Sequence, residues 1–138
     1  REHNITFDHI ASDIVFRSGA KIAMGTWDVT RRFVLTQEEC DKFRNNTQPL
    51  YKALGKAIDE WHPAQNWKPG PVMYDLFPIL WVFDKASYIC EPMHVEVEMT
   101  GTLTRGMTVR TAGEPNVLVT TDIQVDYVRK MYLETVFS

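Results

Sequence analysis

Asp75 is the residue of this sequence most suited to chemistry, because it stands between a loop rich in Pro and Gly and a strongly apolar segment. A carboxylate is costly to bury unless a cation, a hydrogen-bond donor or a helix N-terminus compensates its charge. Asp75 therefore either caps a helix that begins beside it or gives an oxygen ligand to a hard divalent cation such as Ca²⁺. One carboxylate cannot complete such a metal site, and the sequence has no spaced aspartate cluster like that of a calcium-binding loop.

A second group of polar residues opens the chain. Glu2 and Asn4 are two residues apart, so in an extended segment their side chains point to the same side. A carboxylate beside an amide suits a pair of neighbouring hydroxyls such as those of a ribose, whereas polar residues at a chain start are often only solvated. His62 and His94 have no Ser, Cys or Asp neighbour at catalytic spacing, and we interpret both as structural or surface residues.

The elements that must position these residues follow from capping signals and hydrophobic periodicity. Asp8 predicts a capped helix over residues 9–18 that ends at Gly19, and Thr36 with Glu39 forms a capping-box pattern. The remaining predicted helices cover residues 37–44, 49–61, 126–133 and a buried segment from Asp75 onward, with a loop over residues 62–72. The predicted strands cover residues 21–27, 94–99, 107–109 and 117–120, the later ones antiparallel.

Composition excludes several classes of function. The chain has 138 residues, a formal net charge of −3 and 44% hydrophobic residues, which suits one globular domain. We expect no nucleic-acid partner, because phosphate binding needs clustered Lys and Arg. We expect no membrane partner, because the apolar stretches are far shorter than the roughly 20 residues that cross a bilayer. Two isolated cysteines, Cys40 and Cys90, favour a reducing compartment such as the cytoplasm over a disulfide framework.

Four segments carry a more specific pattern. Residues 2–5 are similar to an E-x-N segment followed by Ile or Phe, and residues 25–30 resemble a G-x-D-V-T strand end with one additional residue between Gly and Asp. Residues 71–76 stand in the place of a P-x-H-D-P motif, and residues 95–109 are similar to a V-E-x-x-G-x-x-T-x-G-M-T-V hairpin. In order and spacing the chain resembles the C-terminal part of the inosine-uridine preferring nucleoside hydrolase family over essentially its whole length.

This resemblance implies an α/β fold, in which residues 1–138 form the C-terminal portion of an open, mostly parallel sheet with an antiparallel hairpin and flanking helices. It implies hydrolysis of the N-glycosidic bond of a ribonucleoside to ribose and free base, with Ca²⁺ as the cofactor. Matched residue by residue, it implies that Asp75 is a metal ligand and that Glu2 and Asn4 contact the ribose. It also implies that His3 flanks the ribose pocket.

Two departures from the family pattern limit what the chain can do. Tyr74 stands where many members have a histidine that protonates the leaving base. A phenol ordinarily has a pKa of about 10 and is a poorer proton donor at neutral pH. Proton donation by Tyr74 would therefore need a lowered pKa or a leaving group activated in some other way, and the alternative is that Tyr74 stacks on the base. The N-terminal D-x-D-x-x-x-D-D cluster of the family is absent from this sequence, and with it the general base and most of the calcium site.

The missing cluster leads to two hypotheses about how the chain acts. We expect it to function as part of a longer enzyme, with a missing N-terminal half or a partner chain, and to be inactive alone. The alternative is a self-standing relic that binds a nucleoside, ribose or another protein without catalysis. Apolar surface left open by missing strands then predicts a homo-oligomer or another partner. Nothing in these motifs selects purine over pyrimidine bases.

Overall fold

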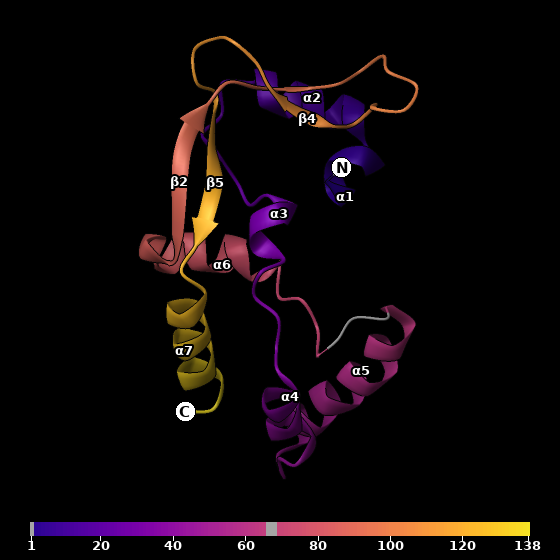
Figure 1. The fold of residues 1–138 in the computed structure, drawn as a ribbon, viewed down its shortest axis with the longest axis vertical. Helices are drawn as coiled ribbons and strands as arrows, with labels where there is room; N and C mark the ends of the chain where they lie inside the picture. The colour runs from indigo at the N-terminus through magenta and orange to yellow at the C-terminus, as the bar shows by residue number, and fades with distance from the viewer. Residues whose placement is uncertain (1, 66–68) are drawn as a thin grey trace.

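The computed structural model describes residues 2–65 and 69–138, with the side chains of residues 61–65 left aside. It contains a three-stranded sheet, a separate two-stranded hairpin and the helices that pack around them (Figure 1). This mixed α/β architecture with an open sheet confirms the predicted fold class. No helix of these two ranges is long and apolar enough to span a bilayer.

The larger sheet has the strand order β1-β5-β2. Its strands are β1 (Ile22–Met24), β2 (Tyr88–Met93) and β5 (Val117–Ile123). The central strand β5 runs parallel to β1 and antiparallel to β2, and it carries buried side chains on both ends. The predicted strand over residues 21–27 is too long, because the chain leaves the sheet after Met24 and Trp27 begins a short helix, α3 (Trp27–Thr30). Strand β2 was not predicted.

The hairpin consists of β3 (Val95–Val97) and β4 (Thr108–Arg110), which pair antiparallel as predicted. Its loop is organised by Glu98, whose side chain accepts hydrogen bonds from the N–H groups of Thr100 (2.8 Å) and Gly101 (3.0 Å). These bonds favour the ionised carboxylate and lower the pKa of Glu98. Gly106 closes the loop at φ 78°, a conformation that suits glycine. The segment around residues 117–120 belongs to the larger sheet rather than to this hairpin.

Most predicted helices are present. Asp8 accepts a hydrogen bond from the N–H of Ala11 at 2.9 Å, and Thr36 and Glu39 form the predicted capping box. The helices are α1 (His3–Phe7), α2 (His9–Arg17), α4 (Gln37–Arg44), α5 (Pro49–Gln65), α6 (Leu76–Phe83) and α7 (Val125–Val136), with a 3₁₀ turn at Lys85–Ser87. Helix α5 continues four residues beyond the predicted end, so the beginning of the predicted loop is helical. Residues 66–68 of that loop lie outside the described residues.

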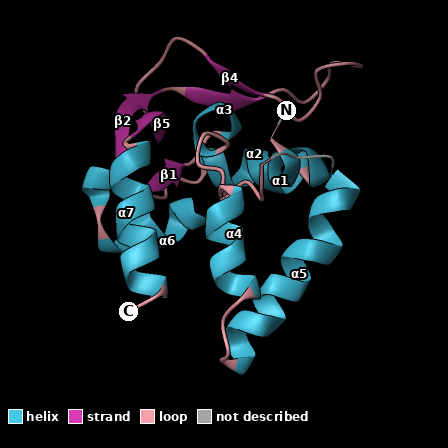
Figure 2. Cartoon of the chain, turned by 60° about the horizontal axis from the view of Figure 1, so that its bottom comes forward, coloured by secondary structure: helices cyan, strands magenta, loops and turns pink. Residues whose placement is uncertain are grey.

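Two apolar clusters hold these elements together. The larger one surrounds Phe33, Leu35 and Val128, which are almost completely buried. In Figure 2, α4, α5 and α7 project together away from β2 and β5. The smaller cluster joins α2 to the hairpin and the sheet through Phe16 and the inward valines of β3 and β5. Each such side chain contributes about 1.5–3 kcal/mol by leaving water.

A buried ion pair joins α7 to α4. The Arg129 guanidinium contacts the carboxylate of Glu39, donates to the carbonyl of Val34 at 2.9 Å and lies over the ring of Phe33 at 5.1 Å. Burial alone would raise the pKa of Glu39, but hydrogen bonds from Arg129 and from Thr36 outweigh it and lower that pKa. The pair therefore holds a charged carboxylate in the core.

Candidate functional site

A hollow of about 710 Å³ lies between the start of the chain, β1 and the residues that lead into α6. Its lining includes every site residue expected above, namely Glu2, His3, Asn4, Tyr74 and Asp75. These residues come from two segments far apart in the sequence. The fold therefore brings the polar pair at the chain start close to the isolated carboxylate of Asp75. Neither local sequence pattern predicted this proximity.

Asp75 occupies the N-cap position of α6, but its side chain does not cap the helix. Its backbone is helical (φ −74°, ψ −1°), whereas a capping residue normally has extended dihedrals. The first amides of α6 are satisfied by the preceding turn instead, because Leu76 N–H donates to Met73 O at 3.2 Å and Phe77 N–H to Tyr74 O at 3.3 Å. The capping interpretation is therefore wrong for this side chain. The Asp75 carboxylate is exposed where it lines the hollow.

The segment that carries Glu2 and Asn4 is helical rather than extended, so the expected alternation of side chains is wrong. The reason is local, since the Glu2 carbonyl accepts hydrogen bonds from the Thr6 N–H (3.0 Å) and the Thr6 hydroxyl (2.8 Å). Glu2 precedes the helix with an extended backbone, and Asn4 and His3 are exposed in its first turn. All three still line the hollow because they lie at its N-terminal wall.

Glu2 also connects two elements of the site. Its Oε1 atom accepts a hydrogen bond from the N–H of Trp27 at 2.9 Å, which is the first residue of α3. Free N–H groups at a helix start attract a carboxylate, so Glu2 serves this helix as a distant cap. The Trp27 ring lies 5.4 Å from the Tyr74 ring between centroids, with the ring planes inclined by 57°. Both aromatic residues line the hollow.

Sequence reasoning missed Trp27, which it placed at the end of a strand. A signal was present, because Trp27 lies in the stretch between Gly25 and Asp28 that is one residue longer than the family pattern. The backbone turn there depends on a distant residue. The N–H of Thr26 donates to the hydroxyl of Thr120 at 2.9 Å, and the Thr26 hydroxyl lies 3.2 Å from the Thr120 carbonyl. This pair fixes the turn that presents Trp27.

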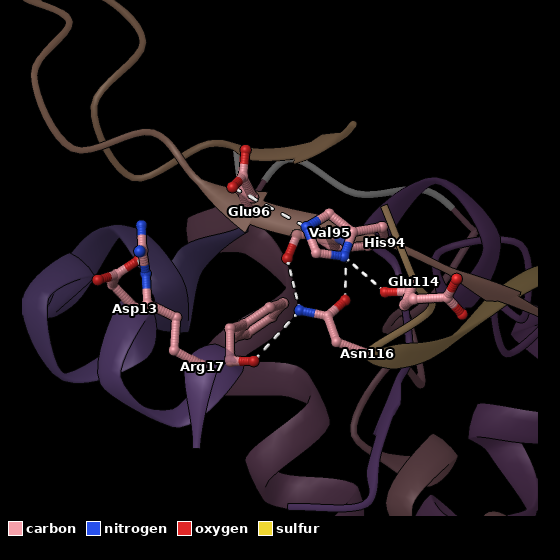
Figure 3. A network of polar contacts seen from close by, with 8 residues as sticks. Asp13, Arg17, His94, Val95, Glu96, Glu114 and Asn116 are labelled. Carbon is pink, nitrogen blue, oxygen red and sulfur yellow. Dashed lines mark hydrogen bonds and ion pairs between the residues drawn. The ribbon is translucent and has the colours of Figure 1, made fainter. Parts of the chain in front are cut away.

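Asn116 connects helix α2 near the chain start to strand β3 of the hairpin. The Asn116 amide donates to the carbonyls of Phe16 (3.2 Å) and Val95 (2.9 Å), while its oxygen accepts from the Val95 N–H at 2.8 Å (Figure 3). His94 belongs to the same network through Nδ1, which lies 2.6 Å from the Glu114 carbonyl. This contact gives His94 a structural role in the network. The side chain of His62 lies outside the described residues.

The metal-binding capacity of the hollow is incomplete. Within residues 2–65 and 69–138, no group of three or more His, Cys, Asp or Glu side chains is arranged to hold a metal ion. The carboxylate of Asp75 lines the hollow and does not cap α6. Its oxygen atoms are hard ligands of the kind that Ca²⁺ prefers. Ca²⁺ takes about six to eight oxygen ligands, so Asp75 supplies one ligand and the described residues do not supply the set.

Comparisons with known proteins bear on the same region. A family model described as inosine-uridine preferring nucleoside hydrolase matches residues 1–130. The chain is 31% identical over 131 residues to the "Pyrimidine-specific ribonucleoside hydrolase RihA" of Citrobacter koseri, and 32% identical over 131 residues to the protein of that name from an Enterobacter species. Each match covers 88% of this chain and 42% of the relative.

Solved structures give a consistent result. The "Purine-Preferring Ribonucleoside Hydrolase from Gardnerella vaginalis" is similar with a TM-score of 0.84 and 25% identity, over 96% of this chain and 44% of that one. The "Plant nucleoside hydrolase - PpNRh1 enzyme" is similar with a TM-score of 0.80 and 20% identity, over 94% and 45% respectively, which shows the fold alone. The chain thus spans less than half the length of the relatives it matches.

Proposed function

Because the chain belongs to the inosine-uridine preferring nucleoside hydrolase family, we propose that it forms part of an enzyme that hydrolyses ribonucleosides. In this reaction water adds across the bond between C1′ and the base nitrogen, so that ribose takes the hydroxyl and the base takes the proton. The observation that supports the proposal is the hollow. It gathers the matched ribose-type residues Glu2 and Asn4 with the uncapped carboxylate of Asp75.

Each residue of the hollow has a role in this proposal. Glu2 and Asn4 bind the ribose hydroxyls, and because Glu2 Oε1 already accepts the Trp27 N–H, its Oε2 atom is the acceptor available to a hydroxyl. His3 flanks the sugar. A ribose held at several points converts attack by water into a positioned step. Carboxylates beside the sugar stabilise the positive charge that develops on it as the base departs.

Asp75 is the residue that would hold the family's calcium ion, together with oxygen ligands from outside the described residues. Bound there, the ion would anchor the ribose hydroxyls and lower the pKa of the attacking water. The general base is equally absent from the motifs of this sequence. We therefore propose that the isolated chain is inactive and that the remaining ligands and the base come from a missing N-terminal half or a partner chain.

Exposed apolar side chains support the need for further protein. Ile79, Val82 and Phe83 of α6 are 53%, 72% and 82% exposed, and Phe7 of α1 and Ile10 of α2 are 85% and 58% exposed. Such clusters mark surfaces that another protein segment covers. We propose that they pack against the rest of the enzyme or, in the isolated chain, against a second copy. The unpaired cysteines support a reducing compartment such as the cytoplasm.

The test combines metal binding with turnover. Calcium titration by calorimetry is carried out on the product of the complete reading frame, on its Asp75→Asn variant and on the control Asp126→Asn, whose carboxylate is exposed in the first turn of α7 away from the hollow. Release of uracil from uridine and of hypoxanthine from inosine is followed for the chain and for the product of the complete reading frame. We expect heat of calcium binding that Asp75→Asn removes and Asp126→Asn retains, with turnover only by the complete product.

Two results would change this assignment. Turnover by the isolated chain would show that the general base lies within it. A complete reading frame whose product binds ribose and calcium but releases no base would favour the alternative, a non-catalytic relic that binds a nucleoside or ribose. The apolar surface then predicts a homo-oligomer, which light scattering measures directly.

A further inference from the structure

A short neck of two extended segments, residues 33–35 and 71–73, leads from the helices α4 and α5 to the hollow. Val34 and Val72 form an isolated antiparallel bridge at its centre. The two hydrogen bonds of the neck join Leu35 N–H to Pro71 O at 3.0 Å and Met73 N–H to Phe33 O at 2.9 Å. Asp75 follows the neck by two residues, so the neck lies directly before the carboxylate that lines the hollow.

The neck needs support from another element. An isolated pair of strands is marginally stable in water, and this pair has only two hydrogen bonds. Both bonds come from the residues on either side of the bridge, so the N–H and C=O groups of Val34 and Val72 point away from the opposite strand. The outward carbonyl of Val34 therefore needs a partner from elsewhere in the fold.

Arg129 of α7 supplies that partner. Its Nη2 atom donates to the Val34 carbonyl at 2.9 Å, and its guanidinium lies over the Phe33 ring at 5.1 Å from the ring centre. Its Nη1 atom contacts the carboxylate of Glu39 in the first turn of α4. The side chains of Arg129 and Glu39 are only 26% and 8% exposed. One side chain thus holds both a strand of the neck and the start of the helix that follows it.

This ion pair is better suited to fixing positions than to adding stability. Taking two charges out of water costs about as much as their attraction returns, so apolar side chains of the same volume would often be equally stable. A guanidinium differs from a point charge because its planar fork directs hydrogen bonds along fixed lines. Arg129 uses two of its nitrogens in this way, one for Glu39 and one for Val34.

We propose that Arg129 is a positioning residue of the calcium site, an inference that rests on the proposed function for the role of Asp75. Arg129 fixes residues 33–35, and these fix residues 71–73 through the bridge. The last residue of the neck accepts a hydrogen bond at 3.2 Å from the N–H of the first residue of α6, which closes the turn around Asp75. Loss of the guanidinium loosens the neck and with it the position of the Asp75 carboxylate.

The first test needs no metal. Hydrogen exchange is measured on the chain at the Leu35 and Met73 amides, with the amides of the central strand β5 as an internal reference. The variants are Arg129→Met, Arg129→Lys, which keeps the charge beside Glu39 but loses the fork, and the matched control Val128→Ala. Val128 is a completely buried residue of the same helix, so its truncation lowers stability through packing alone. Circular dichroism checks folding, and Arg129→Lys carries the test if Arg129→Met does not fold.

We expect the two neck amides of Arg129→Met to exchange roughly ten- to a hundredfold faster relative to β5, which corresponds to the loss of one hydrogen bond to a charged group. Arg129→Lys should show the same change by a smaller factor. Val128→Ala should accelerate exchange at the neck and in β5 alike. Neck exchange that merely follows β5 in both Arg129 variants would overturn the inference, because Arg129 would then serve global stability alone.

The second test connects the neck to the metal. Calcium titration by calorimetry is carried out on the product of the complete reading frame, on the same three variants of it and on Asp75→Asn. We expect Arg129→Met to bind calcium roughly three- to tenfold more weakly, less than the about 10- to 100-fold lost with a direct partner of a metal ligand, and Val128→Ala to retain the affinity. Unchanged affinity in Arg129→Met, with affinity lost in Asp75→Asn, would overturn the positioning role. Calcium binding that Asp75→Asn leaves intact would instead overturn the proposed function, because Asp75 would then not hold the ion.

Discussion

Thr120 offers a sharp test of how the fold positions the site. Its hydroxyl is buried on β5 and accepts the Thr26 N–H at 2.9 Å, one residue before Trp27. Thr120→Val keeps the shape of the side chain and removes this acceptor. An unsatisfied buried donor costs about 1–3 kcal/mol, and because Thr26 is half-buried rather than fully buried, we expect a loss of about 1–2 kcal/mol of unfolding free energy.

The adjacent residue provides a matched control. The Thr121 hydroxyl makes only a 3.4 Å contact to the carbonyl of Ile89, so Thr121→Val should change stability by less than about 0.5 kcal/mol. Urea denaturation followed by circular dichroism gives both values, and the slopes of the two transitions should agree with that of the original chain. The turn before α3 should also loosen in Thr120→Val alone, so the Trp27 amide should exchange its hydrogen faster there than in Thr121→Val.

Equal denaturation midpoints for the two valine variants would refute the reasoning. The Thr26 N–H would then have found another partner, and the register between the end of β1 and β5 would not be what places Trp27. A loss of stability in Thr120→Val with unchanged hydrogen exchange at the Trp27 amide would separate the two consequences. The hydrogen bond would then stabilise the sheet without positioning the site.

Three further predictions concern the frame around the hollow. Arg129→Met leaves the buried Glu39 carboxylate without its cation and should lower the unfolding free energy by about 3 kcal/mol. This is the lower end for a broken buried pair, because the capping-box hydrogen bond remains. As a control, Arg44→Met removes a cation whose carboxylate partners are exposed, and it should cost less than about 1 kcal/mol in the same denaturation assay. The pKa of Glu39 is lower in the folded chain than its ordinary value of 4.5, so the stabilisation from its ionised carboxylate is complete above pH 4.5 and is lost as pH falls through the folded pKa. Stability should therefore fall more steeply with acid in the original chain than in Glu39→Gln. Gly70→Ala would place a methyl group 2.3 Å from the carbonyl oxygen of Leu35, so its thermal unfolding midpoint should fall sharply; an unchanged midpoint would mean that this loop can move away.

Local signals predicted the helices better than the strands. The caps at Asp8 and Thr36 work because donor and acceptor lie within four residues, so the sequence contains the whole interaction. Strand β2 escaped prediction because the apolar and polar residue types of Tyr88–Met93 do not alternate and because it includes Pro92. Its place at the end of the β1-β5-β2 order tolerates a proline.

The site was predictable only in part. Asp75 was singled out from its own surroundings, although the capping alternative could be excluded only from backbone dihedrals that the sequence does not specify. Glu2 and Asn4 drew attention for an alternation that the helix at the chain start removes. Trp27 escaped because the acceptor that bends its backbone is Thr120, which lies on another strand. Long-range partners of this kind leave no mark in local periodicity.

The two walls of the hollow come from the chain start and from the residues before α6, and no short stretch of sequence contains both. Under the proposed function, only the folded chain presents both walls to a nucleoside, so binding and folding are coupled. Each tenfold excess of free ligand over its dissociation constant then adds about 1.4 kcal/mol to the stability of the native state.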